Sequence, residues 1–283
     1  DETDIMPNYI TASGNIAAEE VRRRVADQKP TSQQLFLVDV KTQQATELKY
    51  DTLPGFDEDV LAAVKAENAK AQGKTYQSKK APRAIELIND WSWNQSAIQW
   101  HNSGSQVAVM LKAWDNKDRW LATVDFAKKR LVSQHRLHDD AWINYSFNDF
   151  GWLNNSDSLY YLSEESGYSH LYLKPLKGKA KKLTRGTFEV SSPVLTHDDS
   201  YIYFQANVKH PGNYEVYRTV MASGDMQQLT NLGGSTSFTL SPDEQKLLLN
   251  FSTNLLPNEL YVADAKPDAA VTRLTDTISA QFK

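Results

Sequence analysis

A strand pattern that recurs four times after Ser96 is the feature that most constrains the fold. Each copy has an apolar strand, a polar turn, two further strands and a short fourth strand. Equivalent positions of the first strands lie 52, 43 and 45 residues apart, at Trp100, Trp152, Leu195 and Leu240. The third strands are expected at 120–125, 170–173, 215–218 and 259–264, and the fourth around Leu131, 183–184, 229–230 and 274–275. Four short strands repeated at about 40 to 50 residues are typical of β-propeller blades.

The repeat predicts an all-β fold, a partial arc of four to five four-stranded propeller blades. A twisted sheet has two apolar faces, and blades bury them by stacking face to face around an axis. An earlier strand pair, at 34–39 and 46–49, predicts part of a preceding blade, and residues 277–282 predict the first strand of a following one. The chain is therefore expected to be a fragment, with an N-terminal segment at 1–95 and the four blades plus that first strand at 96–283.

Two short helical insertions are expected near the N-terminus. Residues 15–25 predict a short basic helix with Ile16 and Val21 on its apolar side. Residues 57–72 predict a second helix, because apolar residues there have helical spacing and acidic residues crowd the first turn. Gly73 suits the stop of that helix.

The composition argues against several classes of partner. The formal net charge is -4 and no basic run is present, so nothing favours nucleic acid. No stretch reaches the roughly 20 apolar residues of a membrane span. Cysteine is absent, which excludes disulfides, thiolate metal sites and a cysteine nucleophile. The first residue is Asp1 rather than methionine, so we expect a processed or cut N-terminus that is compatible with a removed leader.

The sequence lacks the common catalytic motifs. A nucleophile elbow needs Gly-x-Ser-x-Gly, and no two glycines are four residues apart. A Gly-rich phosphate loop and a His-Glu-x-x-His zinc motif are also missing. We therefore expect neither a catalytic residue nor a cofactor in this chain.

The nearest approach to a metal-binding constellation is formed by His135, His138, Asp139 and Asp140. Histidines three residues apart can share a metal ion on a helix, but this segment is expected to follow a strand and lead into a loop. We favour a polar connection between blades and predict no metal site.

Glu164 and Glu165 are the candidates for substrate binding. Adjacent carboxylates at the end of a second blade strand can bind a cationic group such as a peptide α-amine. The alternative is that one acid caps the hairpin at 162–172 or pairs with a neighbouring blade, and we favour that structural role. The residues of this hairpin that are then expected to be buried are Tyr168, Leu171 and Tyr172.

The tryptophans are concentrated in one part of the chain, since all seven lie between Trp91 and Trp152. They can form a platform for a sugar or a peptide, or they can pack between sheets, and we favour packing. A five-bladed glycosidase would need acidic residues on separate inner strands. The aligned inner-strand positions are Trp100, Trp152, Leu195 and Leu240, which argues against that class.

The segment 163–172, Ser-Glu-Glu-Ser-Gly-Tyr-Ser-His-Leu-Tyr, resembles a hairpin that recurs in one propeller blade of dipeptidyl peptidase IV-type enzymes, within the prolyl oligopeptidase family of serine peptidases. The similarity extends over residues 90–283. Segments that agree with it are 97–100, 116–120, 141–144 and 238–243, although the Ser-Pro-Asp pattern in the last is shared with other propellers, including TolB-like ones.

This resemblance implies a two-domain serine peptidase. Its catalytic triad would belong to a C-terminal α/β-hydrolase domain of the same polypeptide, and the propeller would restrict entry to short, proline-containing peptides. The family's amine-binding glutamate pair follows an aromatic residue in an aromatic-Glu-Glu pattern that no position here matches, so no site residue is carried over. A homodimer and a periplasmic or secreted location are further expectations, with a cytoplasmic location as the alternative.

Two other functions stay open at this point. A TolB-like propeller would serve as a scaffold that binds a protein or a ligand, and a carbohydrate-active propeller is the least favoured. Within the peptidase interpretation, release of dipeptides, release of tripeptides and internal cleavage are not separated by the sequence.

Overall fold

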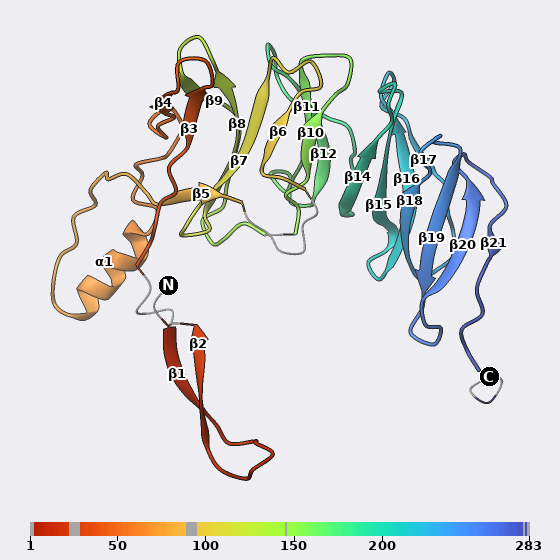
Figure 1. Ribbon diagram of the computed structural model, residues 1–283, viewed down its shortest axis with the longest axis horizontal. Helices are drawn as coiled ribbons and strands as arrows, with labels where there is room; N and C mark the ends of the chain where they lie inside the picture. The colour runs from red at the N-terminus through yellow and green to blue at the C-terminus, as the bar shows by residue number, and fades with distance from the viewer. Residues whose placement is uncertain (1–2, 23–28, 89–94, 145, 280, 282–283) are drawn as a thin grey trace.

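The computed structural model describes residues 3–22, 29–88, 95–144, 146–279 and 281. Four antiparallel four-stranded blades stand side by side in an arc, as Figure 1 shows from the yellow strands to the blue ones. The predicted class, a partial propeller, is confirmed. The four aligned positions each end the first strand of a blade.

The blades follow one another along the chain. Blade 1 consists of β6 (Ile98–Trp100), β7 (Val107–Ala113), β8 (Asp118–Asp125) and β9 (Arg130–His138). Blade 2 consists of β10 (Phe150–Trp152), β11 (Ser158–Ser163), β12 (His170–Pro175) and β13 (Lys181–Lys182). Blade 3 consists of β14 (Val190–Leu195), β15 (Tyr201–His210), β16 (Asn213–Val220) and β17 (Met226–Gln228). Blade 4 consists of β18 (Ser235–Leu240), β19 (Lys246–Ser252), β20 (Glu259–Asp264) and β21 (Thr272–Arg273). The fourth strands of blades 2 to 4 each end at the residue directly before the predicted Leu-Thr pair.

The N-terminal part adds two hairpins, a helix and one strand. Its elements are β1 (Thr3–Asn8), β2 (Ala17–Arg22), β3 (Phe36–Asp39), β4 (Gln44–Glu47), α1 (Ala62–Ala71) and β5 (Ile85–Leu87). The β1–β2 hairpin projects away from the arc (Figure 1). The expected strand pair is present as the antiparallel hairpin β3–β4, although β4 begins two residues earlier than expected. Strand β5 pairs with β7 and so extends the sheet of blade 1.

The helix predicted at 15–25 is wrong. Residues Ala17–Arg22 form β2 and pair in register with β1, and residues 23–25 lie outside the described part of the chain. Pairing of the backbone with another strand outweighs a local helical preference, which is weak over so few residues.

The second predicted helix is confirmed in type, but it begins at Ala62 rather than at residue 57. The acidic residues assigned to its first turn lie before the helix. Glu58 binds Arg136, and the Asp59 carboxylate accepts hydrogen bonds from Lys65, Tyr76 and Ser78. The backbone before the helix therefore follows these tertiary contacts. Gly73 follows the helix in the left-handed region, with φ +67°, as its assigned stop role requires.

Apolar layers between neighbouring sheets hold the arc together. One layer joins the N-terminal part to blade 1, and the next three join the successive blades. Representative residues of the layer between blades 3 and 4 are Tyr203, Val216, Leu229, Leu247 and Leu249. Alternation along each strand sends side chains to the two faces in turn, so one strand serves two layers.

The same hydrogen-bonded anchor closes blades 2, 3 and 4. In blade 3 the hydroxyl of Thr230 donates to Glu215 and accepts from the Val216 amide, while the Gly233 amide donates to Glu215 at 2.7 Å. The corresponding groups are His170, Thr184 and Gly186 in blade 2, and Glu259, Thr275 and Thr277 in blade 4. We call this arrangement the blade anchor. It fixes the segment that leaves each blade.

Blade 4 exposes apolar residues on the face that points away from blade 3. Leu248, Leu260 and Leu274 are 44%, 39% and 54% exposed. They occupy the positions at which blade 3 has the buried residues Tyr203, Val216 and Leu229. The strand predicted at 277–282 is not formed in its described residues, where the Thr277 amide donates to Glu259.

Candidate functional site

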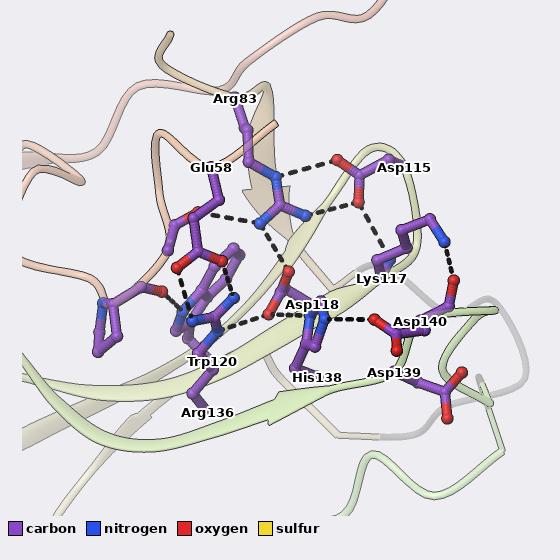
Figure 2. Close-up of polar contacts among 12 residues, drawn as sticks. Glu58, Arg83, Asp115, Lys117, Asp118, Trp120, Arg136, His138, Asp139 and Asp140 are labelled. Atoms are coloured by element: carbon purple, nitrogen blue, oxygen red, sulfur yellow. Dashed lines mark hydrogen bonds and ion pairs between the residues drawn. The ribbon is translucent and has the colours of Figure 1, made fainter. Parts of the chain in front are cut away.

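A network of buried charges lies where the N-terminal part meets blade 1, as Figure 2 shows. The side chain of Asp118, fully buried at the start of β8, accepts 2.6 Å hydrogen bonds from Arg83 Nη1 and Arg136 Nε. His138 Nδ1 lies 3.0 Å from the same carboxylate. Asp115 binds Arg83 through two hydrogen bonds, and Glu58 binds Arg136. We call these six residues the Asp118 network.

The Asp118 network acts as a structural clamp. Its three carboxylates accept hydrogen bonds from the guanidinium groups of Arg83 and Arg136. Burial alone would lower the pKa of both arginines, but these hydrogen bonds raise it above the ordinary value. Gly55 belongs to the clamp because a Cβ there would lie 2.3 Å from Arg136 Nη2, and its φ of +75° suits glycine. The network therefore ties residues 55–58 and 83 to blade 1.

His135 and His138, which were weighed as metal ligands from the sequence, have different partners. The segment continues strand β9 to His138 instead of leaving it, so the two rings project from opposite faces of the strand. His138 joins the Asp118 network, and His135 pairs with Glu165 at 2.6 Å. In the described ranges no group of three or more candidate ligands is close enough to hold a metal ion.

A serine–histidine contact in blade 1 has a structural explanation. His101 Nδ1 lies 2.7 Å from Ser103 Oγ within the turn between β6 and β7. The equivalent turns of blades 3 and 4 are closed by Thr196 with Asp198 and by Ser241 with Asp243. The pair is therefore the turn closure of the repeat and does not create a nucleophile.

A cavity of about 570 Å³ lies beside the hairpin of blade 2, and we call it the Glu164 cavity. Two segments form its walls: the connection from blade 1 to blade 2, and the hairpin between β11 and β12. Ile143 N donates to Asn116 O at 2.8 Å, which holds the first wall against the turn before β8. The lining residues are Asn116, Asp139, Trp142, Ile143, Asn144, Glu164 and Gly167.

The Glu164 carboxylate is half-buried in this cavity. Burial raises its pKa, and the Arg119 charge and hydrogen bonds from Asn144 oppose that rise. Within the described residues, no cation lies within ion-pair distance of Glu164. Asp139 adds a second, exposed carboxylate, and the Trp142 side chain is 77% exposed. The cavity thus combines negative charge with an accessible aromatic ring.

Arg119 holds the two walls of the cavity together from beneath. This fully buried guanidinium donates to Phe147 O and Asn148 Oδ1 at 2.5 Å, and to Leu162 O at 3.0 Å. Burial lowers its pKa to about 10, and the nearby Glu164 charge counters part of that effect. Arg119 fixes both the wall that carries Trp142 and the strand that leads to Glu164.

The two adjacent glutamates point to different partners. Glu164 lines the cavity, whereas Glu165 binds His135 of blade 1. That hydrogen bond lowers the pKa of Glu165. In the same hairpin Leu171 and Tyr172 are buried as expected, but Tyr168 is exposed, so that part of the prediction is wrong. One side of the hairpin thus packs in the apolar layers through Leu171 and Tyr172, and the other side lines the cavity through Glu164.

The tryptophans divide between packing and exposure. Trp120 and Trp152 are buried in apolar layers, which agrees with the favoured interpretation. Trp100 and Trp142 are exposed, Trp114 is partly buried, and Trp91 and Trp93 lie outside the described residues. Sequence reasoning missed Trp142, Asn144 and Arg119 as parts of a site. The available signal was that the segments 116–120 and 141–144 both agreed with the propeller of the same family.

The four blades define a propeller region. A family model for the "Dipeptidyl peptidase IV (DPP IV) N-terminal region" matches residues 89–258, more than half of the chain. The chain therefore belongs to this family, and the resemblance inferred from segment 163–172 is confirmed.

Known relatives agree with this assignment. Dipeptidyl peptidase 4 of Arthroderma otae is 31% identical over 109 residues, 37% of this chain and 14% of that protein. Dipeptidyl peptidase 4 of Trichophyton equinum is 27% identical over 152 residues, 51% of this chain and 19% of that protein.

Two solved structures share the fold. Porphyromonas gingivalis dipeptidyl peptidase 4 has a TM-score of 0.64 at 14% identity, with 99% of this chain and 34% of that one covered. A putative dipeptidyl aminopeptidase IV from Bacteroides ovatus has a TM-score of 0.62 at 14% identity, with 97% and 36% covered. The chain thus spans about a third of the length of these structures. No helix in the described ranges is long and apolar enough to cross a membrane.

Proposed function

We propose that this chain gates and positions short peptides, including proline-containing ones, for a dipeptidyl peptidase IV-like serine peptidase. The serine, histidine and aspartate of catalysis would come from an α/β-hydrolase domain of the same polypeptide. The chain itself contributes the walls that a peptide meets before cleavage.

The observation that carries this proposal is the Glu164 cavity in a chain of the DPP IV N-terminal family. Its volume of about 570 Å³ lies in the range of about 300–1,000 Å³ that is usual for small-molecule sites. The connection between blades 1 and 2 forms one wall, and the blade 2 hairpin supplies the Glu164 carboxylate. A peptide held there would be oriented by segments that the two blades support.

The decisive experiment uses the polypeptide that contains this chain together with its hydrolase domain. Glu164→Gln keeps the shape of the side chain and removes its charge, so kcat/KM on short proline-containing peptides is expected to fall about tenfold, the loss of one hydrogen bond to a charged group. Glu165→Gln is the matched control on the neighbouring residue, with less than a twofold effect. Equal kcat/KM values for both variants and the unmodified enzyme would refute a role for the cavity.

A second measurement concerns the isolated chain. It is expected not to react with a fluorophosphonate probe, because no serine here has an activating base in a nucleophile elbow. Stoichiometric labelling of a serine, located by mass spectrometry, would contradict the proposed division of labour between the domains.

A further inference from the structure

We infer that the Glu164 cavity is a subsite for an organic cation, the ammonium or guanidinium group of a lysine or arginine side chain in the bound peptide. This inference rests on the proposed function and specifies which peptides the cavity favours. It is drawn from the charge, the aromatic ring and the size of the cavity.

The charge of the lining selects a cation. Among the described lining residues the ionisable side chains are those of Glu164 and Asp139, and both are acidic. The nearest cations are already engaged: Lys117 Nζ donates to the carbonyl oxygens of Asp140 and Ala141, and Arg119 is buried beneath the cavity. A bound cation would compensate the half-buried Glu164 carboxylate, whose hydrogen bonds come from the neutral Asn144. A buried carboxylate is more favourable when it is paired.

The aromatic ring and the size select an organic cation over a metal ion. Trp142 lines the cavity and is exposed, and an indole face attracts ammonium and guanidinium groups by about 0.5–1 kcal/mol at exposed sites. The volume of about 570 Å³ far exceeds the roughly 30 Å³ share of one water molecule. Three convergent ligands for a metal ion are not found among the residues that the structure describes.

Binding to this chain can be measured by isothermal titration calorimetry at pH 7. The probe is acetyl-Gly-Arg-amide, and its neutral counterpart is acetyl-Gly-citrulline-amide, which has nearly the same shape. The arginine peptide is expected to bind at least tenfold more tightly. Equal affinity for the two peptides, or no binding to chain that is folded by circular dichroism, would overturn the inference.

Matched variants locate the site. Glu164→Gln and Trp142→Ala are each expected to weaken binding of the arginine peptide, by about tenfold and about threefold. Glu165→Gln and Trp100→Ala change a neighbouring acid and an exposed tryptophan on another blade segment, and both are expected to leave the affinity within twofold. An unchanged affinity in Glu164→Gln would overturn the inference.

One further probe separates side-chain cations from the peptide N-terminus. Gly-Pro-amide has a free α-amine and no other cation, and it is expected to bind at least tenfold more weakly than acetyl-Gly-Arg-amide. Tighter binding of Gly-Pro-amide would overturn the assignment to basic side chains. If Glu164→Gln lowers kcat/KM in the full enzyme equally for basic and neutral peptides, the proposed gating function stands and the cation subsite fails.

Discussion

His135 Nε2 lies 2.6 Å from a carboxylate oxygen of Glu165, and this contact joins the last strand of blade 1 to the hairpin of blade 2. The His135 ring also packs against Tyr161 with 4.5 Å between ring centroids. The contact spans the apolar layer between blades 1 and 2. Its loss would therefore lower the stability of both blades.

The Glu165 contact predicts a specific pH dependence of stability. Its hydrogen bond with His135 lowers the pKa of Glu165 below the usual 4.5 in the folded chain. The stabilisation is therefore complete above pH 4.5 and is lost as the pH falls through the lowered pKa, because the unfolded chain takes up the proton first. Glu165→Gln should cost about 0.5 to 1 kcal/mol at pH 5.5, since the carboxylate is partly exposed. Melting temperatures of the two proteins should converge near pH 3, and a constant difference would contradict the assignment.

Tyr172 should carry much of the packing energy of the hairpin. It is buried against Tyr161, with ring centroids 5.5 Å apart, and its hydroxyl donates to Ser166. Tyr172→Ala should lower the free energy of unfolding by about 3 to 5 kcal/mol, as for other large aromatic residues in cores. Tyr168→Ala is the control in the same hairpin and should cost below about 0.5 kcal/mol, because that ring is exposed. Urea denaturation measures both, and similar losses would be inconsistent with this packing.

Asp118 should be the most sensitive residue of the clamp. Its removal leaves Arg83 and Arg136 each without one buried carboxylate partner, so Asp118→Ala should cost about 3 to 5 kcal/mol. Asp140→Ala removes an exposed carboxylate near His138 and should change stability by less than about 0.5 kcal/mol. Limited proteolysis with sequencing of the products should show cleavage at 57–61 in Asp118→Ala alone. Resistance of that segment in both variants would show that the clamp is not needed to hold it.

The blade anchor predicts a penalty for removing one hydroxyl. Thr230→Val keeps the shape of the side chain but removes one hydrogen bond to Glu215 and leaves the Val216 amide without its acceptor, which should cost about 1 to 3 kcal/mol. Thr230→Ser retains the hydroxyl and should recover most of that loss. Thr239→Val makes the same substitution on an exposed face of β18, outside the anchor. It therefore controls for the general effect of a threonine-to-valine change on stability. A Thr230→Val variant as stable as the Thr239→Val variant in urea would refute the anchor.

Arg119 should set the pH range of the cation subsite. Its charge favours the ionised form of Glu164, so removing it in Arg119→Met should raise the pKa of Glu164 further. Binding of acetyl-Gly-Arg-amide requires the carboxylate, and the pH below which it weakens should therefore move upward. Arg119→Lys keeps the charge and should restore the original profile. Calorimetric titrations from pH 4 to pH 7 test this, and superimposable profiles for Met and Lys variants would exclude an electrostatic role.

The blades could be predicted from the sequence because their signal repeats. Each first strand and polar turn recurs at a similar spacing, so a weak local pattern gained support from its copies. The N-terminal part has no copy to compare with. The helix expected at 15–25 failed there because its residues pair with β1, a contact between distant positions that helical spacing cannot reveal.

The candidate site was predictable only in part. Glu164 was identified because two adjacent acids are conspicuous in a hairpin. Its separation from Glu165 depends on His135 of another blade, which the sequence could not place nearby. Trp142 and Arg119 belong to segments whose approach depends on the stacking of blades 1 and 2. A cavity between segments requires that three-dimensional arrangement before its lining can be named.

The blade anchor also has a consequence for how such an arc can lengthen. The residues that make its core, such as Glu215 and Thr230, belong to one repeat, and the anchored connector follows directly in the chain. A gene segment that encodes one repeat therefore also encodes the anchor residues that hold the connector to the next blade. Duplication or exchange of whole blades can preserve every anchor, whereas a boundary placed between Glu215 and Thr230 would break one. Chimeric propellers built from this chain should be joined after the threonine.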